Sequence, residues 1–139
     1  MNAKVQDLMT VNVITTQPHV SIGHARSMMA KNKIGGLPVV DADGKPVGIV
    51  SASDLLADLK PASPIKTIMT EKVFTVAKYD DASTAARVMK NQKIHRVLVT
   101  HEKKVVGVLS AFDLLDLVTD HRFVMKNAPS KPKRKAARQ

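Results

Sequence analysis

Two short segments of this chain carry a serine and, three residues later, an aspartate. They are residues 51–54 (Ser-Ala-Ser-Asp) and residues 110–113 (Ser-Ala-Phe-Asp), and each follows an apolar run that contains a glycine. A carboxylate at neutral pH only accepts hydrogen bonds, so it suits a diol, which presents two donors. The amides at the start of a helix favour a phosphate nearby. Each segment is therefore suited to a ligand that carries both groups.

The same spacing has a second interpretation that needs no ligand. Ser51 with Asp54, and Ser110 with Asp113, also fit a capping box, in which the two residues satisfy each other's backbone amides at the start of a helix. The two roles are compatible for the serines, so both interpretations stay open.

Both segments belong to an internal repeat of about 60 residues. The matching positions include Met9-Thr10 with Met69-Thr70, Ala25 with Ala85, Met29 with Met89, and Lys33-Ile34 with Lys93-Ile94. Such a tandem duplication predicts an architecture of two similar structural units. Two copies give a closed pair rather than an extended solenoid, and we expect a cleft between the two halves.

Each repeat shows the same order of elements. A short apolar turn at residues 5–9 or 65–69 precedes a strand at residues 13–15 or 73–75. A helix follows, with Ser21 or Asp81 placed to cap it. The helices are predicted from apolar residues at three- and four-residue spacing: Ile22, Ala25, Met28 and Met29, and then Ala82, Ala85, Val88 and Met89.

A hairpin and a final helix complete each repeat. Asp43-Gly44 between residues 37–40 and 46–50 is a strong hairpin signal, and residues 97–99 and 105–109 form the second hairpin. The final helices begin at Ser51 and Ser110. They are expected to turn these residues toward a core: Leu55, Leu56, Leu59, Leu114, Leu115 and Val118.

The predicted fold class is therefore α/β (α+β), with two β-α-β-β-α repeats packed pseudo-symmetrically into one module. We expect repeat 1 at residues 1–60 and repeat 2 at residues 61–121, joined by a proline-containing linker at residues 60–64. About 50 residues hold too little core to be secure alone, so the halves should pack together.

Composition limits the class of protein. The 139 residues are 44% hydrophobic and include no cysteine, which excludes disulfides and thiolate chemistry. No apolar run approaches the roughly 18 residues of a membrane span, and no signal-peptide core begins the chain. We expect a soluble, cytoplasmic protein. The net charge is +10, and six positive charges lie in residues 126–139, so residues 122–139 are predicted to form a basic, disordered tail.

The ordered elements, with glycine, two apolar residues and Ser-x-x-Asp at the last junction of each repeat, resemble the cystathionine-β-synthase (CBS) domain. The tandem resembles a CBS pair, or Bateman module, over residues 1 to about 121. The resemblance implies that the cleft binds AMP, ADP, ATP or S-adenosylmethionine, with no required cofactor. It also implies that Asp54 and Asp113 accept hydrogen bonds from ribose hydroxyls, while Ser51 and Ser110 help to hold phosphate.

The resemblance implies further ligand contacts. His95-Arg96 would contact phosphates, although a solvated loop charge is the alternative, and repeat 1 has Gly35-Gly36 there instead. We therefore expect two inequivalent clefts. Phe112 is expected either to flank an adenine face or to pack in the core. The complete set of predicted nucleotide-binding residues is Val13, Ile14, Thr15, Gly36, Pro38, Ser51, Ser53, Asp54, Val73, Phe74, Thr75, His95, Arg96, Val97, Ser110, Phe112 and Asp113.

The remaining residues suggest no catalysis. The five histidines lack metal-ligand spacing, and no nucleophile or glycine-rich phosphate loop is present, so neither an enzyme nor a metal site is expected. The leading hypothesis is a regulatory, ligand-sensing module that acts through homodimerisation or a partner protein. The alternative is a nucleic-acid-binding protein that works through its basic tail. Attraction of that tail to an anionic membrane surface is a further alternative.

Overall fold

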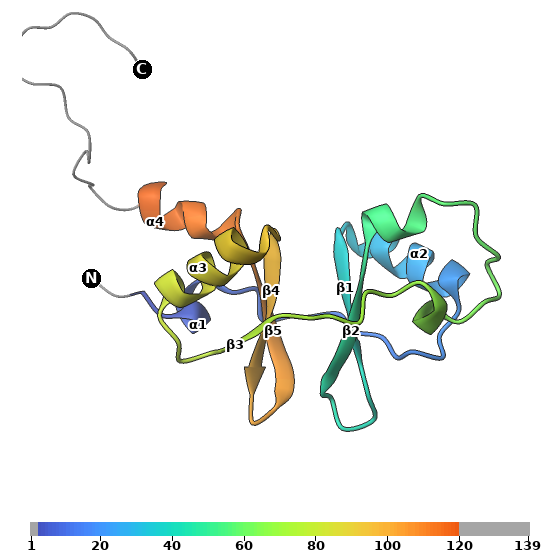
Figure 1. Cartoon of the computed structure of the whole chain (residues 1–139), viewed down its shortest axis with the longest axis horizontal. Coiled ribbons are helices and arrows are strands. Elements are labelled where there is room, and N and C mark those ends of the chain that lie inside the picture. The colour runs from blue at the N-terminus through green and yellow to red at the C-terminus, as the bar shows by residue number, and fades with distance from the viewer. Residues whose placement is uncertain (1–2, 120–139) are drawn as a thin grey trace, which may run out of the picture.

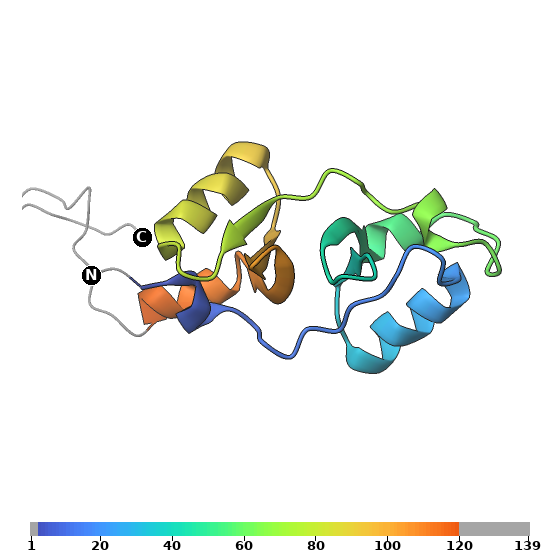
Figure 2. The same cartoon turned by 90° about the horizontal axis from the view of Figure 1, so that it is seen from below.

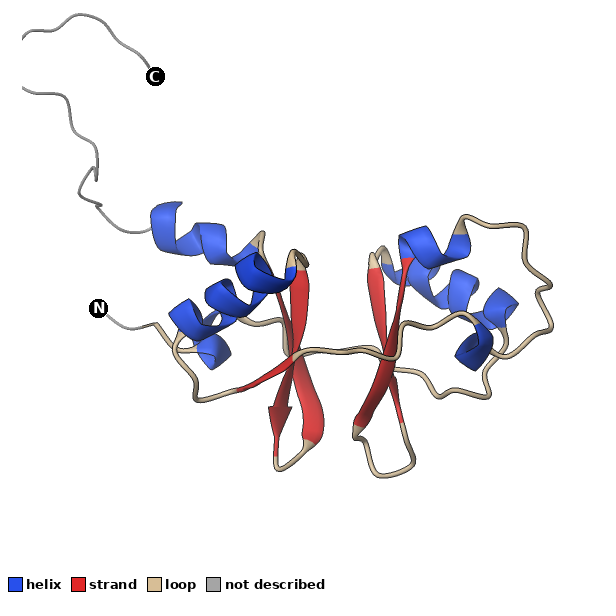
Figure 3. Cartoon of the chain, in the orientation of Figure 1, coloured by secondary structure: helices blue, strands red, loops and turns tan. Residues whose placement is uncertain are grey.

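Two β-hairpins face each other across the middle of the molecule (Figures 1 and 3). The computed structural model describes residues 3–119. Strands β1 (Gly36–Val40) and β2 (Pro46–Ser51) form one antiparallel hairpin, and β4 (Arg96–His101) and β5 (Lys104–Ser110) form the other. A short strand, β3 (Thr75–Ala77), adds to β4 in parallel. Both predicted hairpins and the mixed α/β class are confirmed.

One long helix packs against each sheet on the side away from the other hairpin (Figure 1). These helices are α2 (Ile22–Asn32) and α3 (Ala82–Gln92), and both end in a left-handed lysine. Their buried residues are Ile22, Ala25 and Met29, and Ala82, Ala85 and Met89, as the apolar spacing predicts. The side chain of Ser21 accepts a hydrogen bond from the His24 amide at 3.1 Å, which confirms its capping role.

Asp81 does not cap α3 with its side chain. Its carboxylate instead accepts a hydrogen bond from Lys4 Nζ at 2.7 Å. This bond raises the pKa of Lys4 above its usual value. The Asp81 carboxylate, predicted to cap α3, thus binds Lys4 of the N-terminal segment instead.

The first element of each repeat packs on the other repeat. Helix α1 (Val5–Leu8) lies in the core of β3, β4, β5 and α3, where Val5 is 0% exposed. The short 3-10 helix η2 (Ile65–Thr67) lies in the core of β1, β2 and α2, where Ile65 is 0% exposed. Figure 2 shows the two connections that cross between the halves. We call α2, β1 and β2 with η2 the first unit, and α1, α3 and β3–β5 the second unit.

These crossings explain a difference from the predicted strands. Residues 13–15 form no strand, and next to them the first unit has a parallel bridge between Thr16 and Val39 in place of a strand such as β3. In the second unit, β3 begins at Thr75, the last residue of the predicted strand at residues 73–75. Thr10 pairs with Val108 in the second unit, and Thr70 pairs with Ile49 in the first. The residues that follow Thr10 and Thr70 must therefore cross from one unit to the other.

The final helices differ from the predicted ones. They are the 3-10 helix η1 (Ala52–Leu55) in the first unit and, in the second, η3 (Asp113–Leu115) followed by α4 (Asp116–Thr119). Leu55, Leu59 and Leu114 pack against the cores. Leu56, Leu115 and Val118 are 85%, 50% and 53% exposed, so their predicted core role is wrong. A single 3-10 turn presents one side to the core, and a residue next to Leu55 or Leu114 points away from it.

Two glycines allow the exchanged segments to approach the hairpins closely. A Cβ on Gly48 would lie 2.7 Å from Met69 Sδ and 3.1 Å from the Thr70 carbonyl oxygen. A Cβ on Gly107 would meet Met9 and Thr10 in the same way. The Met-Thr pair of each repeat therefore packs against the glycine of the other repeat. The predicted tail at residues 122–139 lies outside the described residues.

Candidate nucleotide site between the repeats

The first Ser-x-x-Asp turn connects β2 to η1. Asp54 Oδ2 accepts a hydrogen bond from the Ser51 amide at 2.8 Å, and the hydroxyls of Ser51 and Ser53 are 2.8 Å apart. Asp54 thus holds the turn with one carboxylate oxygen. Within residues 3–119, its Oδ1 accepts no hydrogen bond.

The second turn connects β5 to η3 and is a reciprocal capping box. Asp113 Oδ2 accepts from the Ser110 amide at 2.9 Å, and Ser110 Oγ accepts from the Asp113 amide at 3.1 Å. The capping interpretation is therefore confirmed for this turn. Asp113 Oδ1, like its counterpart in the first turn, accepts no hydrogen bond from the described residues. One oxygen of each carboxylate thus remains available to an external donor.

The two turns are linked across the unit interface. Gly36 pairs with Ser51 in the first hairpin, and Arg96 pairs with Ser110 in the second. Arg96 reaches across the interface, and its Nη1 lies 3.5 Å from the Gly35 carbonyl oxygen. These positions form one continuous row, Ser51–Gly36–Arg96–Ser110, which we call the interface row. It links one cation to both Ser-x-x-Asp turns.

The predicted base-pocket residues lie in and beside the two crossing connections (Figure 2). Val13, Ile14 and Thr15 are half-buried, and Ile14 packs on the first core. Val73 and Phe74 are also half-buried, Phe74 packs on the second core, and Thr75 is exposed. Lys72 Nζ lies 5.7 Å from the centroid of the Phe74 ring.

The other predicted residues differ in exposure. Pro38 and Val97 are fully buried in their strands, and the Pro38 carbonyl oxygen accepts a hydrogen bond from the Thr16 amide at 2.9 Å. His95 is exposed, and its carbonyl oxygen accepts from the Ala111 amide at 2.7 Å. Phe112 is 78% exposed, which rules out the core alternative for its ring.

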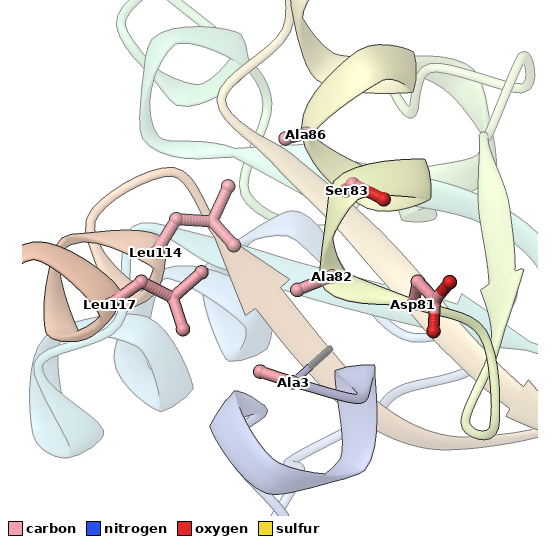
Figure 4. Close-up of a pocket in the computed structure, with 7 residues that line it drawn as sticks. All are labelled: Ala3, Asp81, Ala82, Ser83, Ala86, Leu114 and Leu117. Atoms are coloured by element: carbon pink, nitrogen blue, oxygen red, sulfur yellow. The ribbon is translucent and has the colours of Figure 1, made fainter. Parts of the chain in front are cut away.

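A surface pocket of about 180 Å³ lies away from these residues, in the second unit (Figure 4). It is lined by Ala3, Asp81, Ala82, Ser83, Ala86, Leu114 and Leu117. The repeat explains it. In the first unit Arg26 Nη2 donates to the Leu55 carbonyl oxygen at 3.1 Å, whereas 60 residues later the small Ala86 leaves that place open. None of the predicted nucleotide-binding residues lines this pocket.

Sequence reasoning missed the exchange of segments that builds the site. The repeated Met-Thr and glycine signals were visible, but a repeat pattern does not say which copy contacts which. It also left open which cleft the basic pair of repeat 2 serves. The described residues contain no cluster of histidine, aspartate and glutamate that could hold a metal ion. No helix among them has the length and apolar character needed to cross a membrane.

Comparison with known proteins agrees with this architecture. A model of the CBS domain matches residues 5–60 and again residues 65–120. The chain therefore belongs to the CBS domain family, as a tandem pair.

Solved structures of CBS domain pairs share the fold. The CBS domain pair of protein MJ0100, in complex with 5′-methylthioadenosine and S-adenosyl-L-methionine, has a TM-score of 0.78 and 30% sequence identity, covering 86% of this chain and 98% of that one. CBSX2 in complex with AMP has a TM-score of 0.76 and 26% identity, covering 84% of this chain and 96% of that one. The cytosolic domain of the Mg²⁺ channel MgtE, in complex with ATP, has a TM-score of 0.74 and 26% identity, covering 82% and 48%.

Among curated proteins, the chain is 35% identical to the uncharacterized protein MJ1404 of Methanocaldococcus jannaschii, over 86% of this chain and 32% of that protein. It is 29% identical to inosine-5′-monophosphate dehydrogenase of the same organism, over 81% of this chain and 23% of the enzyme. The chain thus spans about a third or less of the length of these two relatives.

Proposed function

We propose that this CBS pair is a regulatory module that binds an adenine nucleotide or adenosyl compound between its two repeats. The observation that carries the proposal is the interface row, in which Arg96 is linked to the two Ser-x-x-Asp turns, whose aspartates each keep one oxygen available. The ligands of the related structures all contain adenosine, and they differ in the group at the 5′ position.

Each part of such a ligand has a matching group in the chain. Oδ1 of Asp54 or Asp113 would accept from ribose hydroxyls, and a hydrogen bond to a charged group contributes about 1.5–3 kcal/mol. The guanidinium of Arg96 suits a phosphate, because it offers several donors in a planar fork. Apolar residues of the crossing connections would contact the base.

The proposed output is a change in the placement of the two units. A ligand that contacts both units stabilises the arrangement to which it binds better, and it shifts the population by that difference in affinity. Leu115 and Val118 are half-exposed apolar residues on η3 and α4, and they offer a surface for a second copy or a partner protein.

Calorimetry on protein verified as ligand-free tests the proposal. Adenosine, methylthioadenosine, S-adenosylmethionine, AMP, ADP and ATP would be titrated in parallel. We expect saturable binding of at least one of them with a matching rise in melting temperature. Absence of binding for the whole panel would refute the proposed function.

A further inference from the structure

The first repeat has Gly35-Gly36 where the second has His95-Arg96, and the structure places these two segments against each other. A Cβ on Gly36 would lie 3.0 Å from Arg96 Cδ and 3.2 Å from its Nε and Nη1. A Cβ on Gly35 would lie 3.3 Å from Arg96 Nη2. The arginine side chain therefore lies along the glycine backbone of the other repeat.

The backbone itself does not demand glycine at these positions. Gly44 is the one described glycine with a positive φ, so Gly35 and Gly36 have conformations open to other residues. Real Cβ contacts are rarely as short as 3.0–3.2 Å, and here three atoms of one side chain would be approached at once. The side chain of Arg96 is thus what makes a larger residue at position 36 unfavourable.

The guanidinium in this position keeps most of its donors available. Its one hydrogen bond within residues 3–119 is the long contact to the Gly35 carbonyl oxygen at 3.5 Å, and no carboxylate of these residues forms an ion pair with it. Arginine carries five N–H donors and stays charged at neutral pH. The contact with glycine therefore restricts the side chain without neutralising it.

From these contacts we infer that Gly36, with Gly35, is a positioning residue that holds Arg96 for an anionic ligand group. The inference rests on the proposed function. A side chain contributed by repeat 2 would select phosphorylated ligands, and its place would be set by two residues of repeat 1 that carry no side chain. A second arginine at position 36 would put two cations against each other, so the glycines also make the two clefts unequal.

A double-mutant cycle with AMP and adenosine tests the inference. Arg96→Ala should weaken AMP binding about tenfold or more and spare adenosine, because it removes a charge-assisted contact. Gly36→Ala should weaken AMP several-fold and also spare adenosine, because it displaces the arginine. In the Arg96→Ala background, Gly36→Ala should change neither affinity. Gly35→Ala, whose Cβ would approach only Nη2 of Arg96, is the milder substitution to use if Gly36→Ala folds poorly.

Gly23→Ala is the matched control. Its Cβ would lie 3.3 Å from Pro61 Cβ, as close as the contact at Gly35, but away from the arginine. It should leave the ratio of AMP to adenosine affinity unchanged. The inference is overturned if Gly36→Ala weakens AMP and adenosine equally, or if its effect persists without Arg96. Wild-type protein that binds neither compound nor any other ligand of the panel would instead refute the proposed function itself.

Discussion

The two aspartates of the Ser-x-x-Asp turns have two tasks at once. In each, Oδ2 accepts the serine amide at the start of the turn, at 2.8 Å in the first and 2.9 Å in the second. An alanine at either position would remove both this bond and any ligand contact, so a loss of binding would have two explanations. Asparagine is the sharper substitution, because its carbonyl oxygen can keep the bond to the serine amide.

We expect Asp54→Asn and Asp113→Asn each to weaken adenosine binding at its own site by about 1.5–3 kcal/mol, with little change in melting temperature. The amide would present a donor where a ribose hydroxyl also donates. Calorimetry gives the affinities and thermal unfolding the stability. Asp58→Asn, at an exposed aspartate nearby, is the control and should change neither. A fall in stability without a change in affinity would assign the aspartates to capping alone.

Phe112 gives a second test at the scale of one residue. Its ring is 78% exposed, so Phe112→Ser should change the free energy of unfolding by no more than about 0.5 kcal/mol. The substitution copies Ser53, its counterpart in the first turn. If the ring flanks the adenine base, AMP and adenosine should lose affinity equally, because both carry the base. Unchanged affinities for both would remove Phe112 from the site.

At the scale of elements, the exchanged helix α1 supplies part of the second core. Val5 is 0% exposed there and packs with Val76, Ala85 and Met89. We expect Val5→Ala to destabilise the protein by roughly 1–3 kcal/mol, through lost burial and a residual cavity. Val11→Ala is the control in the same segment, since Val11 is 60% exposed. Urea unfolding measures both, and equal effects would show that α1 is not packed as described.

The elements also show how far sequence reasoning reached. Apolar spacing predicted α2 and α3, and turn signals predicted both hairpins, because these patterns record contacts within one stretch of chain. The exchange of α1 and η2 was not predicted, because both copies carry equivalent apolar turns and either core could accept either turn. The burial of the final helices was overestimated for a related reason. Adjacent leucines such as Leu55 and Leu56 fit the apolar spacing of a helix face, but a single turn packs only one of them against the core.

The site was predicted in its residues rather than in its arrangement. The serines, aspartates and Arg96 were identified from their types and from the family resemblance. Their alignment in one interface row depends on how the two hairpins face each other, which no local pattern encodes. The contact of Arg96 with Gly35 and Gly36 joins residues about 60 positions apart. From the sequence, these glycines indicated only that repeat 1 lacks the basic pair of repeat 2.

At the scale of the whole molecule, the packing units and the sequence repeats are different stretches of chain. The residues of the first core and those packed against it run from Ile14 to Met69. Those of the second core include Val5, Leu8 and Met9 and then continue from Phe74 to Leu114. Each core is therefore completed by a segment from the other repeat, so the stretch of chain that builds a core is not the same as one sequence repeat.

This organisation predicts which half of the chain folds alone. A fragment of residues 12–70 contains every residue of the first core, whereas residues 1–60, a fragment of nearly the same length, lack Ile65, Ile68 and Met69. The second fragment also carries Val5 without the core that buries it. We expect residues 12–70 to show helical circular dichroism and a cooperative thermal transition, and residues 1–60 to show neither or a much lower midpoint. Ile65→Ala in residues 12–70 should lower its midpoint toward that of residues 1–60, because it removes a fully buried side chain. Equal stability of the two fragments would mean that η2 contributes nothing to the first core, contrary to the packing of Ile65.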